Sequence, residues 1–487
     1  MRPSYSLVLL PLSLALIAGC GRPGGGGGGG GGGTPGGDLV AGLDIASVTI
    51  NQAVSIELDT TGDALDSRAR VVEGRPAVIR AFVEPEDGWD GREVVGVLEF
   101  EDGEVYSDEK AVDDDSSISS MSSTFNFSVP GSEIVEDAAF TISLRELDAP
   151  SAPEGNTNGA TWPGETPAVL DTRDPGGPVT VVLVPIRYNN DGSGRLPDIS
   201  DDHIETLRNE FFKQYPVAEV DFVVAEPWAT GRYIDNFGTG WGELLDEFTN
   251  WRSGRANFGE YYYGLFSPRS SYEEFCQGAC IAGLSWRPES PFNDGGRASI
   301  GLGYPGFDGV SAAGIMVHEV GHAHGREHAP CGLGNQPSDA SYPYSQASIG
   351  TWGYDIVDGG LKSPNQYTDF MAYCDPTWVS DYTFGDLQDW VRDTNSAAAW
   401  VVEAAPLWWS SYVLSDDGAT ATGTTLFDRP PGAESVAVEL LDGNGNVLEE
   451  VDARFMGFNH LPGGGLWVPQ QSGAVSARLA DGTVLAL

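Results

Sequence analysis

Four of the six histidines in the chain lie within the eleven residues His318-Glu319-Val320-Gly321-His322-Ala323-His324-Gly325-Arg326-Glu327-His328. The preceding apolar residues are compatible with a helix, which would place His318 and His322 at i and i+4 on one face. Gly325 can adopt a left-handed backbone, so the chain can leave the helix and bring His328 to the same ion. Three imidazoles suit zinc and leave a fourth position open, as in catalytic zinc sites.

Glu319 follows the first of these histidines and would take a proton from water activated by the metal. Satisfied core histidines are the simpler alternative, but the five fixed positions would match by accident with a probability on the order of 10⁻⁵. His324 matches no required position. His203 and His460 lie outside any ligand spacing, so we interpret both as ordinary residues.

The pattern His-Glu-x-x-His-x-x-Gly-x-x-His resembles the signature of the metzincin zinc metalloproteases, and residues 369–373 (Asp-Phe-Met-Ala-Tyr) resemble their Met-turn. The likeness covers roughly residues 179–400. Within it, residues 328–332 and 369–384 most resemble bacterial secreted and surface lipoprotein proteases, including mucin-cleaving ones. It implies that Met371 forms an apolar floor beneath the zinc. Tyr373 stands where a tyrosine reaches the zinc in the astacin and serralysin branches, although Ala329 departs from the astacins, which carry Glu there.

The resemblance also implies an edge strand ahead of the zinc helix, along which an extended peptide substrate would pair. We expect residues 298–301 to lie beside this strand, and the strand itself to consist of Ile281, Ala282, Gly283, Leu284, Ser285 and Trp286.

The elements that must position these residues are predicted by the hydrophobic pattern. The continuous apolar run at 179–186 is typical of a strand buried on both faces. A helix capped by Ser200, a strand at 220–225, a second helix around 244–251 and a strand at 261–266 follow. This alternation predicts a mixed sheet with crossover helices.

Two β-rich regions flank this unit, so we predict a multidomain protein with three folded parts. Short alternating segments at 39–147 favour an antiparallel β-sandwich of immunoglobulin-like size. Residues 148–178 contain six prolines and are predicted to be a linker. The α/β metzincin-like catalytic domain would occupy 179–404, and a small C-terminal β domain 405–487.

The first residues are typical of an export signal, with a charged start, an apolar stretch and small residues before a cysteine. The string Leu16-Ile17-Ala18-Gly19-Cys20 resembles a bacterial lipobox, which implies a signal peptide at 1–19 and lipidation of Cys20. Residues 20–38 would be a Gly-rich tether with a reach of roughly 20 Å. We expect a lipoprotein anchored at the cell envelope or released outside the cell; an ordinary signal peptide is the alternative.

Four further cysteines, an even number in an exported chain, predict two disulfides, whereas free buried thiols are the alternative. The residues alone allow three pairings and favour partners that are neighbours in the sequence. The metzincin resemblance brings the segments after His328 and Met371 beneath one ion. It therefore implies the pair Cys331–Cys374 and leaves Cys276 with Cys280.

The chain carries 71 acidic and 26 basic residues, a formal net charge of −45, which argues against a nucleic-acid partner. Oxygen-bearing side chains at 189–194 make calcium binding possible, but a plain turn is favoured because no bidentate glutamate follows at the EF-hand distance.

The predicted function is a monomeric zinc endopeptidase that hydrolyses proteins or glycoproteins outside the cell. A surface adhesin with an inactive zinc domain is one alternative, which the intact Glu319 argues against. A zinc hydrolase of a non-peptide amide or ester is another, since the motif fixes the metal chemistry and not the substrate.

Overall fold

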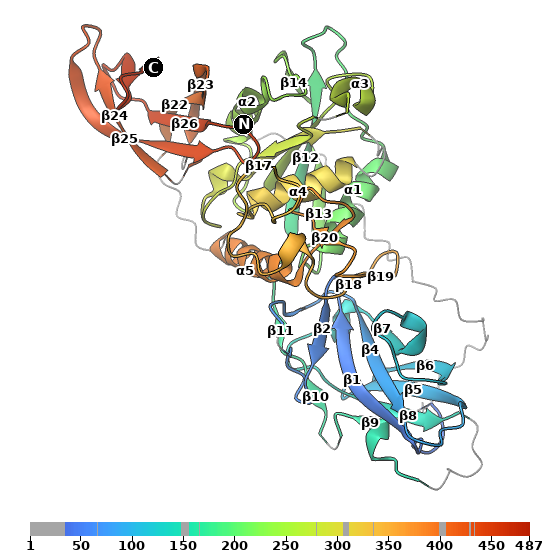
Figure 1. The fold of residues 1–487 in the computed structure, drawn as a ribbon. Helices are drawn as coiled ribbons and strands as arrows, with labels where there is room; N and C mark the ends of the chain where they lie inside the picture. Colours follow the sequence, from blue (N-terminus) through green and yellow to red (C-terminus); the bar gives the residue numbers. More distant parts are fainter. Residues whose placement is uncertain are drawn as a thin grey trace.

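The computed structural model shows a β-sandwich, an α/β unit and a C-terminal sheet in chain order (Figure 1). It describes residues 35–65, 67–147, 155–164, 166–278, 280–304, 311–334, 336–398, 406–427, 430–432 and 434–487. The expected signal peptide, Cys20 and most of the expected tether lie outside these ranges. Within them, no helix has both the length and the apolar character needed to cross a membrane.

The N-terminal unit is built mainly of two antiparallel sheets with strand orders β2-β1-β4-β7 and β10-β8-β5-β6, in which β10 is Ala168–Val169. The sheets approach closely at Gly96 of β5, where an added Cβ would lie 2.6 Å from the Phe125 ring of β7. The main strands are β1 (Leu43–Asn51), β2 (Ser55–Leu58), β4 (Ala77–Pro85), β5 (Glu93–Phe100), β6 (Val105–Ala111), β7 (Phe125–Val129) and β8 (Ala139–Glu146).

The structure corrects the expected linker at 148–178. Short strands β9 (Thr161–Trp162) and β10 (Ala168–Val169) both pair with β8, and β11 (Thr172–Arg173) pairs with β3 (Val71–Val72). Trp162 is buried and its ring centroid lies 5.6 Å from that of Phe140. The prolines keep these strands short, but the apolar residues between them complete the sandwich.

The α/β unit is built on a sheet of order β13-β12-β15-β17-β16, parallel except for the antiparallel edge strand β16. Val181 and Leu183 of β12 belong to the core formed with α1 and α4, whereas Val182 and Val184 belong to the core formed with α2. The strand is therefore buried on both faces, as its apolar run predicts. The bounds are β12 (Val179–Tyr188), α1 (Asp201–Gln214), β13 (Val220–Val224), β14 (Trp228–Thr230), α2 (Trp241–Arg252), β15 (Tyr261–Phe266), α3 (Tyr272–Cys276), β16 (Gly283–Ser285), β17 (Ala298–Leu302) and α4 (Ala312–Ala323).

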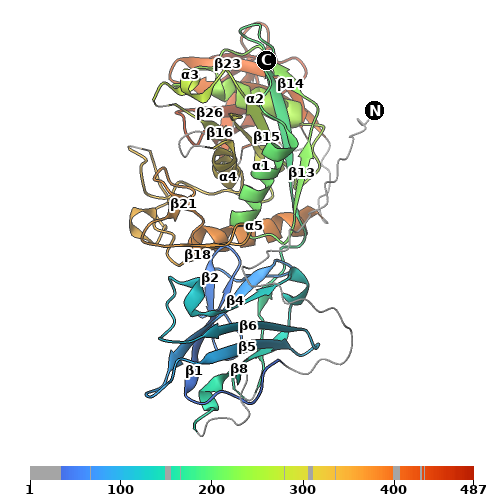
Figure 2. The same cartoon turned by 90° about the vertical axis from the view of Figure 1, so that its right-hand side faces the viewer.

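After α4 the chain forms loops with two small pairs of strands and then helix α5. Both overall views place α5 between the α/β unit and the β-sandwich (Figures 1 and 2). These elements are β18 (Gly353–Asp355), β19 (Gly360–Lys362), β20 (Thr368–Asp369), β21 (Thr377–Trp378) and α5 (Asp381–Ala398).

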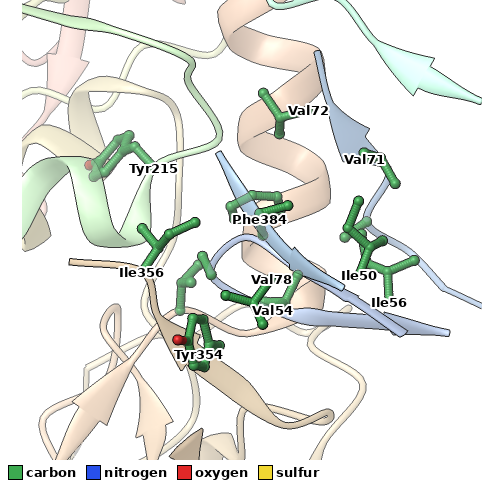
Figure 3. Close-up of a cluster of buried hydrophobic side chains, with 14 of the residues drawn as sticks. Ile50, Val54, Ile56, Val71, Val72, Val78, Tyr215, Tyr354, Ile356 and Phe384 are labelled. Atoms are coloured by element: carbon green, nitrogen blue, oxygen red, sulfur yellow. The ribbon is translucent and has the colours of Figure 1, made fainter. Parts of the chain in front are cut away.

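One hydrophobic core continues from the sandwich into the α/β unit. Val54 and Val78 of the sandwich lie close to Tyr354, Ile356 and Phe384, which follow α4 (Figure 3). The N-terminal unit is therefore packed against the α/β unit and the segment after α4 through apolar contacts of the kind found inside a domain.

Arg75 strengthens this junction. Its side chain is fully buried, and it donates hydrogen bonds to the carbonyl oxygens of Phe212 (2.6 Å), Val217 (2.8 Å) and Gln52 (2.7 Å). Burial lowers the pKa of Arg75 to about 9, so the guanidinium stays charged at neutral pH. A cation from the sandwich thus satisfies carbonyls at the C-terminus of α1.

The C-terminal unit is a seven-stranded antiparallel sheet of order β23-β22-β26-β25-β24-β27-β28. It contacts α2, where Asn250 donates to the hydroxyl of Ser411 over 2.8 Å. Its strands are β22 (Leu407–Ser415), β23 (Gly418–Phe427), β24 (Glu434–Leu441), β25 (Val447–Gly457), β26 (Gly464–Pro469), β27 (Ser476–Arg478) and β28 (Val484–Ala486).

Candidate metal centre

Helix α4 presents the first two histidines. It begins after Ser311, whose hydroxyl accepts a hydrogen bond from the Gly314 amide over 3.0 Å. His318 and His322 lie one turn apart, with their Nε2 atoms separated by 3.1 Å. The i, i+4 spacing therefore brings both imidazoles to one point, as the sequence predicts.

Gly325 ends the helix with a φ of +78°, a conformation that favours glycine. An added Cβ there would also lie 2.5 Å from the Trp390 ring. The chain then turns back, and the Nε2 atom of His328 lies 3.1 Å from that of His322. All three predicted ligands converge.

Main-chain carbonyl oxygens orient two of the rings. The Nδ1 atom of His318 lies 2.8 Å from the Phe370 oxygen, and that of His322 lies 2.7 Å from the Arg326 oxygen. Because a carbonyl can only accept, Nδ1 carries the proton in both rings and Nε2 keeps its lone pair for a metal.

The imidazoles are also held neutral. Burial lowers the pKa of His318 to about 4 and that of His328 to about 2, and it lowers the pKa of His322 well below its usual value. Neutral imidazole is the form that binds metal ions.

A fourth histidine joins the group. One ligand atom from each of His318, His322, His328 and His460 lies within 4.8 Å of the others. His460 lies in the connection between β25 and β26. Because it joins the three motif histidines, its interpretation as an ordinary residue is wrong. The only signal in the sequence was a rare histidine in a Gly- and Pro-rich turn, which specifies no partner.

Glu319 is 2% exposed and faces this group. Its Oε1 atom lies 2.9 Å from His460 Nε2, and its Oε2 atom accepts a hydrogen bond from the side-chain Nδ2 of Asn459 over 3.2 Å. A Cβ added at Gly283 would lie 2.4 Å from Glu319 Oε1, so edge strand β16 runs directly beside the carboxylate.

The predicted Met-turn lies against α4. Met371 is buried, and its sulfur would be 2.5 Å from a Cβ added at Gly321. The Met371 amide donates to Asp369 over 2.8 Å, and its carbonyl accepts from Ala329 over 3.0 Å. These hydrogen bonds tie the turn to the segment that carries His328.

Tyr373 reaches the cluster. Its hydroxyl lies 3.2 Å from His328 Nε2 and is hydrogen-bonded to His460 Nδ1. Burial, and then the charge of Glu319, raise the pKa of Tyr373. The phenol therefore stays protonated and can donate a hydrogen bond.

Both disulfides expected from the sequence are present. Cys331–Cys374 joins the segment after His328 to the segment after Met371, and the Tyr373 amide donates to the Cys331 carbonyl over 2.9 Å. Cys276–Cys280 lies just before the edge strand.

The candidate substrate strand is shorter than expected. Of residues 281–286, only Gly283–Ser285 form strand β16, which pairs antiparallel with β17. The Ala282 carbonyl continues the pairing by accepting from the Leu302 amide over 2.9 Å, whereas Trp286 is buried in the core beside α2.

The remaining candidates do not join the centre. His324 stacks on Tyr261, with ring centroids 3.9 Å apart, and burial lowers its pKa to about 3. In the loop at 189–194, Asp191 accepts a hydrogen bond from the Ser193 amide and pairs with Arg195 over 3.1 Å, so it forms the plain turn that the sequence favours over a calcium site. The four-histidine group is the only such cluster found among the described residues.

Buried imidazoles around one point, with a carboxylate beside them, are compatible with a metal ion and with the class of metallopeptidases. More particularly, a family model described as Peptidase M66 matches residues 291–375. A search of curated proteins found no match. The matched segment contains Glu319, Tyr373 and the three motif histidines and ends before His460. Together, the match and the cluster support a metallopeptidase.

Proposed function

We propose that the protein is a zinc-dependent endopeptidase of the metzincin type that hydrolyses proteins or glycoproteins outside the cell. The observation that carries this proposal is the convergence of His318, His322 and His328 beside the buried carboxylate of Glu319. The Peptidase M66 match supports the peptidase class, and two disulfides are compatible with an exported protein.

Each side chain has a defined task in this reaction. Zinc held by the three histidines would supply Lewis acidity toward the scissile carbonyl and the attacking water. Glu319 would accept the proton of that water and return it to the leaving amine. The Tyr373 hydroxyl would donate to the oxyanion that develops on the substrate.

Strand β16 would position the substrate. It is the edge of its sheet, and its outer backbone groups can pair with an extended peptide. Gly283 brings this edge against Glu319, so a paired peptide would lie with its backbone beside the base.

The test compares Glu319→Gln with wild type after zinc loading. We expect unchanged zinc content and thermal stability, but loss of peptide hydrolysis by several orders of magnitude, because only the base is removed. Glu327→Gln is a matched control, since this nearby carboxylate pairs with Arg287 over 3.2 Å. Mass spectrometry of digested proteins and glycoproteins, with and without a chelator, defines the cleaved bonds.

If zinc-loaded wild-type and His460→Ala proteins both leave peptides intact, the peptidase assignment fails. Cleavage of ester or non-peptide amide probes by the same proteins would then favour another zinc hydrolase.

A further inference from the structure

The connection between β25 and β26, residues 458–463, reaches from the C-terminal sheet into the metal centre. We propose that this segment, termed the plug loop, holds the site in a latent state by occupying the open metal position, the general base and the substrate edge together. The inference rests on the proposed peptidase function and adds its regulation.

The first contact concerns the metal. Three histidine ligands leave one position for water or substrate, whereas a fourth protein ligand closes the site. The His460 side chain is 8% exposed and contributes a ligand atom to the four-histidine group. Its other neighbour, the Tyr373 hydroxyl, fixes the ring by hydrogen bonding to Nδ1. With zinc held by the other three histidines, His460 would compete with the water or the substrate carbonyl for the fourth position.

The second contact concerns the base. Both oxygens of Glu319 face the plug loop. Oε1 lies 2.9 Å from His460 Nε2, and Oε2 lies 3.2 Å from the side-chain Nδ2 of Asn459. Water must compete with these contacts for the carboxylate oxygens, so the loop weakens the action of Glu319 as a base.

The third contact concerns the substrate edge. The amide of Ser285 in β16 donates to the Asn459 side-chain oxygen over 3.2 Å. Phe458 forms an antiparallel bridge with Trp286, and their rings stack with centroids 5.0 Å apart. The plug loop therefore uses the pairing groups that an extended peptide would need.

The plug loop is also fitted to the catalytic unit. A Cβ added at Gly242 of α2 would lie 2.6 Å from the Phe458 ring, and one at Gly238 would lie 2.6 Å from the Leu461 side chain. Within the loop, the Phe458 amide donates to the Gly463 carbonyl over 3.1 Å. Such close packing against two glycines indicates a defined position of the plug loop on the α/β unit. A peptide can reach the site only after the loop leaves this position.

The experiment uses the full chain and the variants His460→Ala and Asn459→Ala. Asn444→Ala is the matched control, because Asn444 is exposed in the turn between β24 and β25 of the same sheet. The readout independent of turnover is the binding of acetohydroxamate to the cobalt-substituted proteins, followed by their visible spectra. Thermal unfolding checks that each variant is folded, and peptide hydrolysis is measured on the zinc forms.

A latent state favoured about ten to one lowers the apparent affinity of a competing ligand about tenfold. We therefore expect both loop variants to bind acetohydroxamate at least about tenfold more tightly than wild type and Asn444→Ala, and to hydrolyse peptide correspondingly faster. His460→Ala alone should change the cobalt spectrum, because it replaces a histidine ligand with water.

Equal hydroxamate affinity in wild type and both loop variants would overturn the latent state. So would a fall in turnover at unchanged affinity, which would make His460 a participant in the reaction. Tighter hydroxamate binding without hydrolysis by any variant would support the plug loop while refuting the peptidase function.

Discussion

Gly283 and Glu319 are packed so closely that a single methyl group at position 283 would lie 2.4 Å from the carboxylate oxygen. Strand β16 and the Glu319 carboxylate therefore fix each other's position, although Gly283 and Glu319 belong to different elements.

We predict that Gly283→Ala displaces the Glu319 carboxylate and lowers peptide turnover about a hundredfold, since a displacement of about 1 Å can have that effect. Zinc content should not change. Gly360→Ala is the control, because a Cβ at that position meets no atom within 4 Å. Turnover and metal analysis of both variants check the prediction, and wild-type turnover in Gly283→Ala would contradict it.

Tyr373→Phe should retain zinc and lose about a hundredfold in turnover, the effect expected when one donor to an oxyanion is removed. Because Tyr373 also holds His460, the comparison is best made in the His460→Ala background. Tyr367→Phe serves as control, since that ring packs against Lys362. Equal turnover would show that the Tyr373 hydroxyl does not act on the substrate.

Replacing Cys331 and Cys374 by serine should weaken zinc binding about tenfold, because the disulfide holds the segments of His328 and Met371 together. The lost loop closure, over a separation of 43 residues, should cost about 4 kcal/mol of stability.

The matched control replaces Cys276 and Cys280 by serine. Their separation of 4 residues corresponds to a loop-closure contribution of about 2 kcal/mol to stability. Zinc competition titrations and chemical unfolding measure both effects. Identical zinc affinity in the two double variants would argue against a role for Cys331–Cys374 at the centre.

Asp246 should make the docking of the C-terminal sheet sensitive to pH. It is fully buried on α2, where it accepts hydrogen bonds from Asn250 and from Thr422 of β23. Burial raises its pKa from 3.8 to about 7. The native state therefore binds the proton more tightly than the unfolded state, and stability falls as the pH rises from about 4 through about 7.

Asp246→Asn removes this titration. Compared with wild type, the variant should gain stability across that interval and be more stable by about 4 kcal/mol at pH 8. Urea unfolding at several pH values checks this, with Glu243→Gln on the same helix as control. A pH-independent difference between Asp246→Asn and wild type would contradict the prediction.

The sequence could predict the features that depend on residues close together in the chain. His318 and His322 share a helical face, Gly325 ends the helix, and the burial of β12 on both faces follows from a continuous apolar run. His460 could not be placed, because its contact with Glu319 depends on how two sheets dock. Strands β9 to β11 could not be predicted, because they lie in a segment rich in prolines and other turn residues. Such a composition indicates a linker unless the partner strand is known.

The buried guanidinium of Arg75 limits where the chain can be cut into fragments that fold by themselves. Cutting at the start of β12 would leave the carbonyls at the end of α1 without their donor and would expose the apolar surface that now faces Val54 and Val78. The sandwich thus acts as an intramolecular scaffold for the catalytic unit. A fragment starting at residue 179 is expected to aggregate, and limited proteolysis should release the sandwich and the catalytic unit as one resistant body.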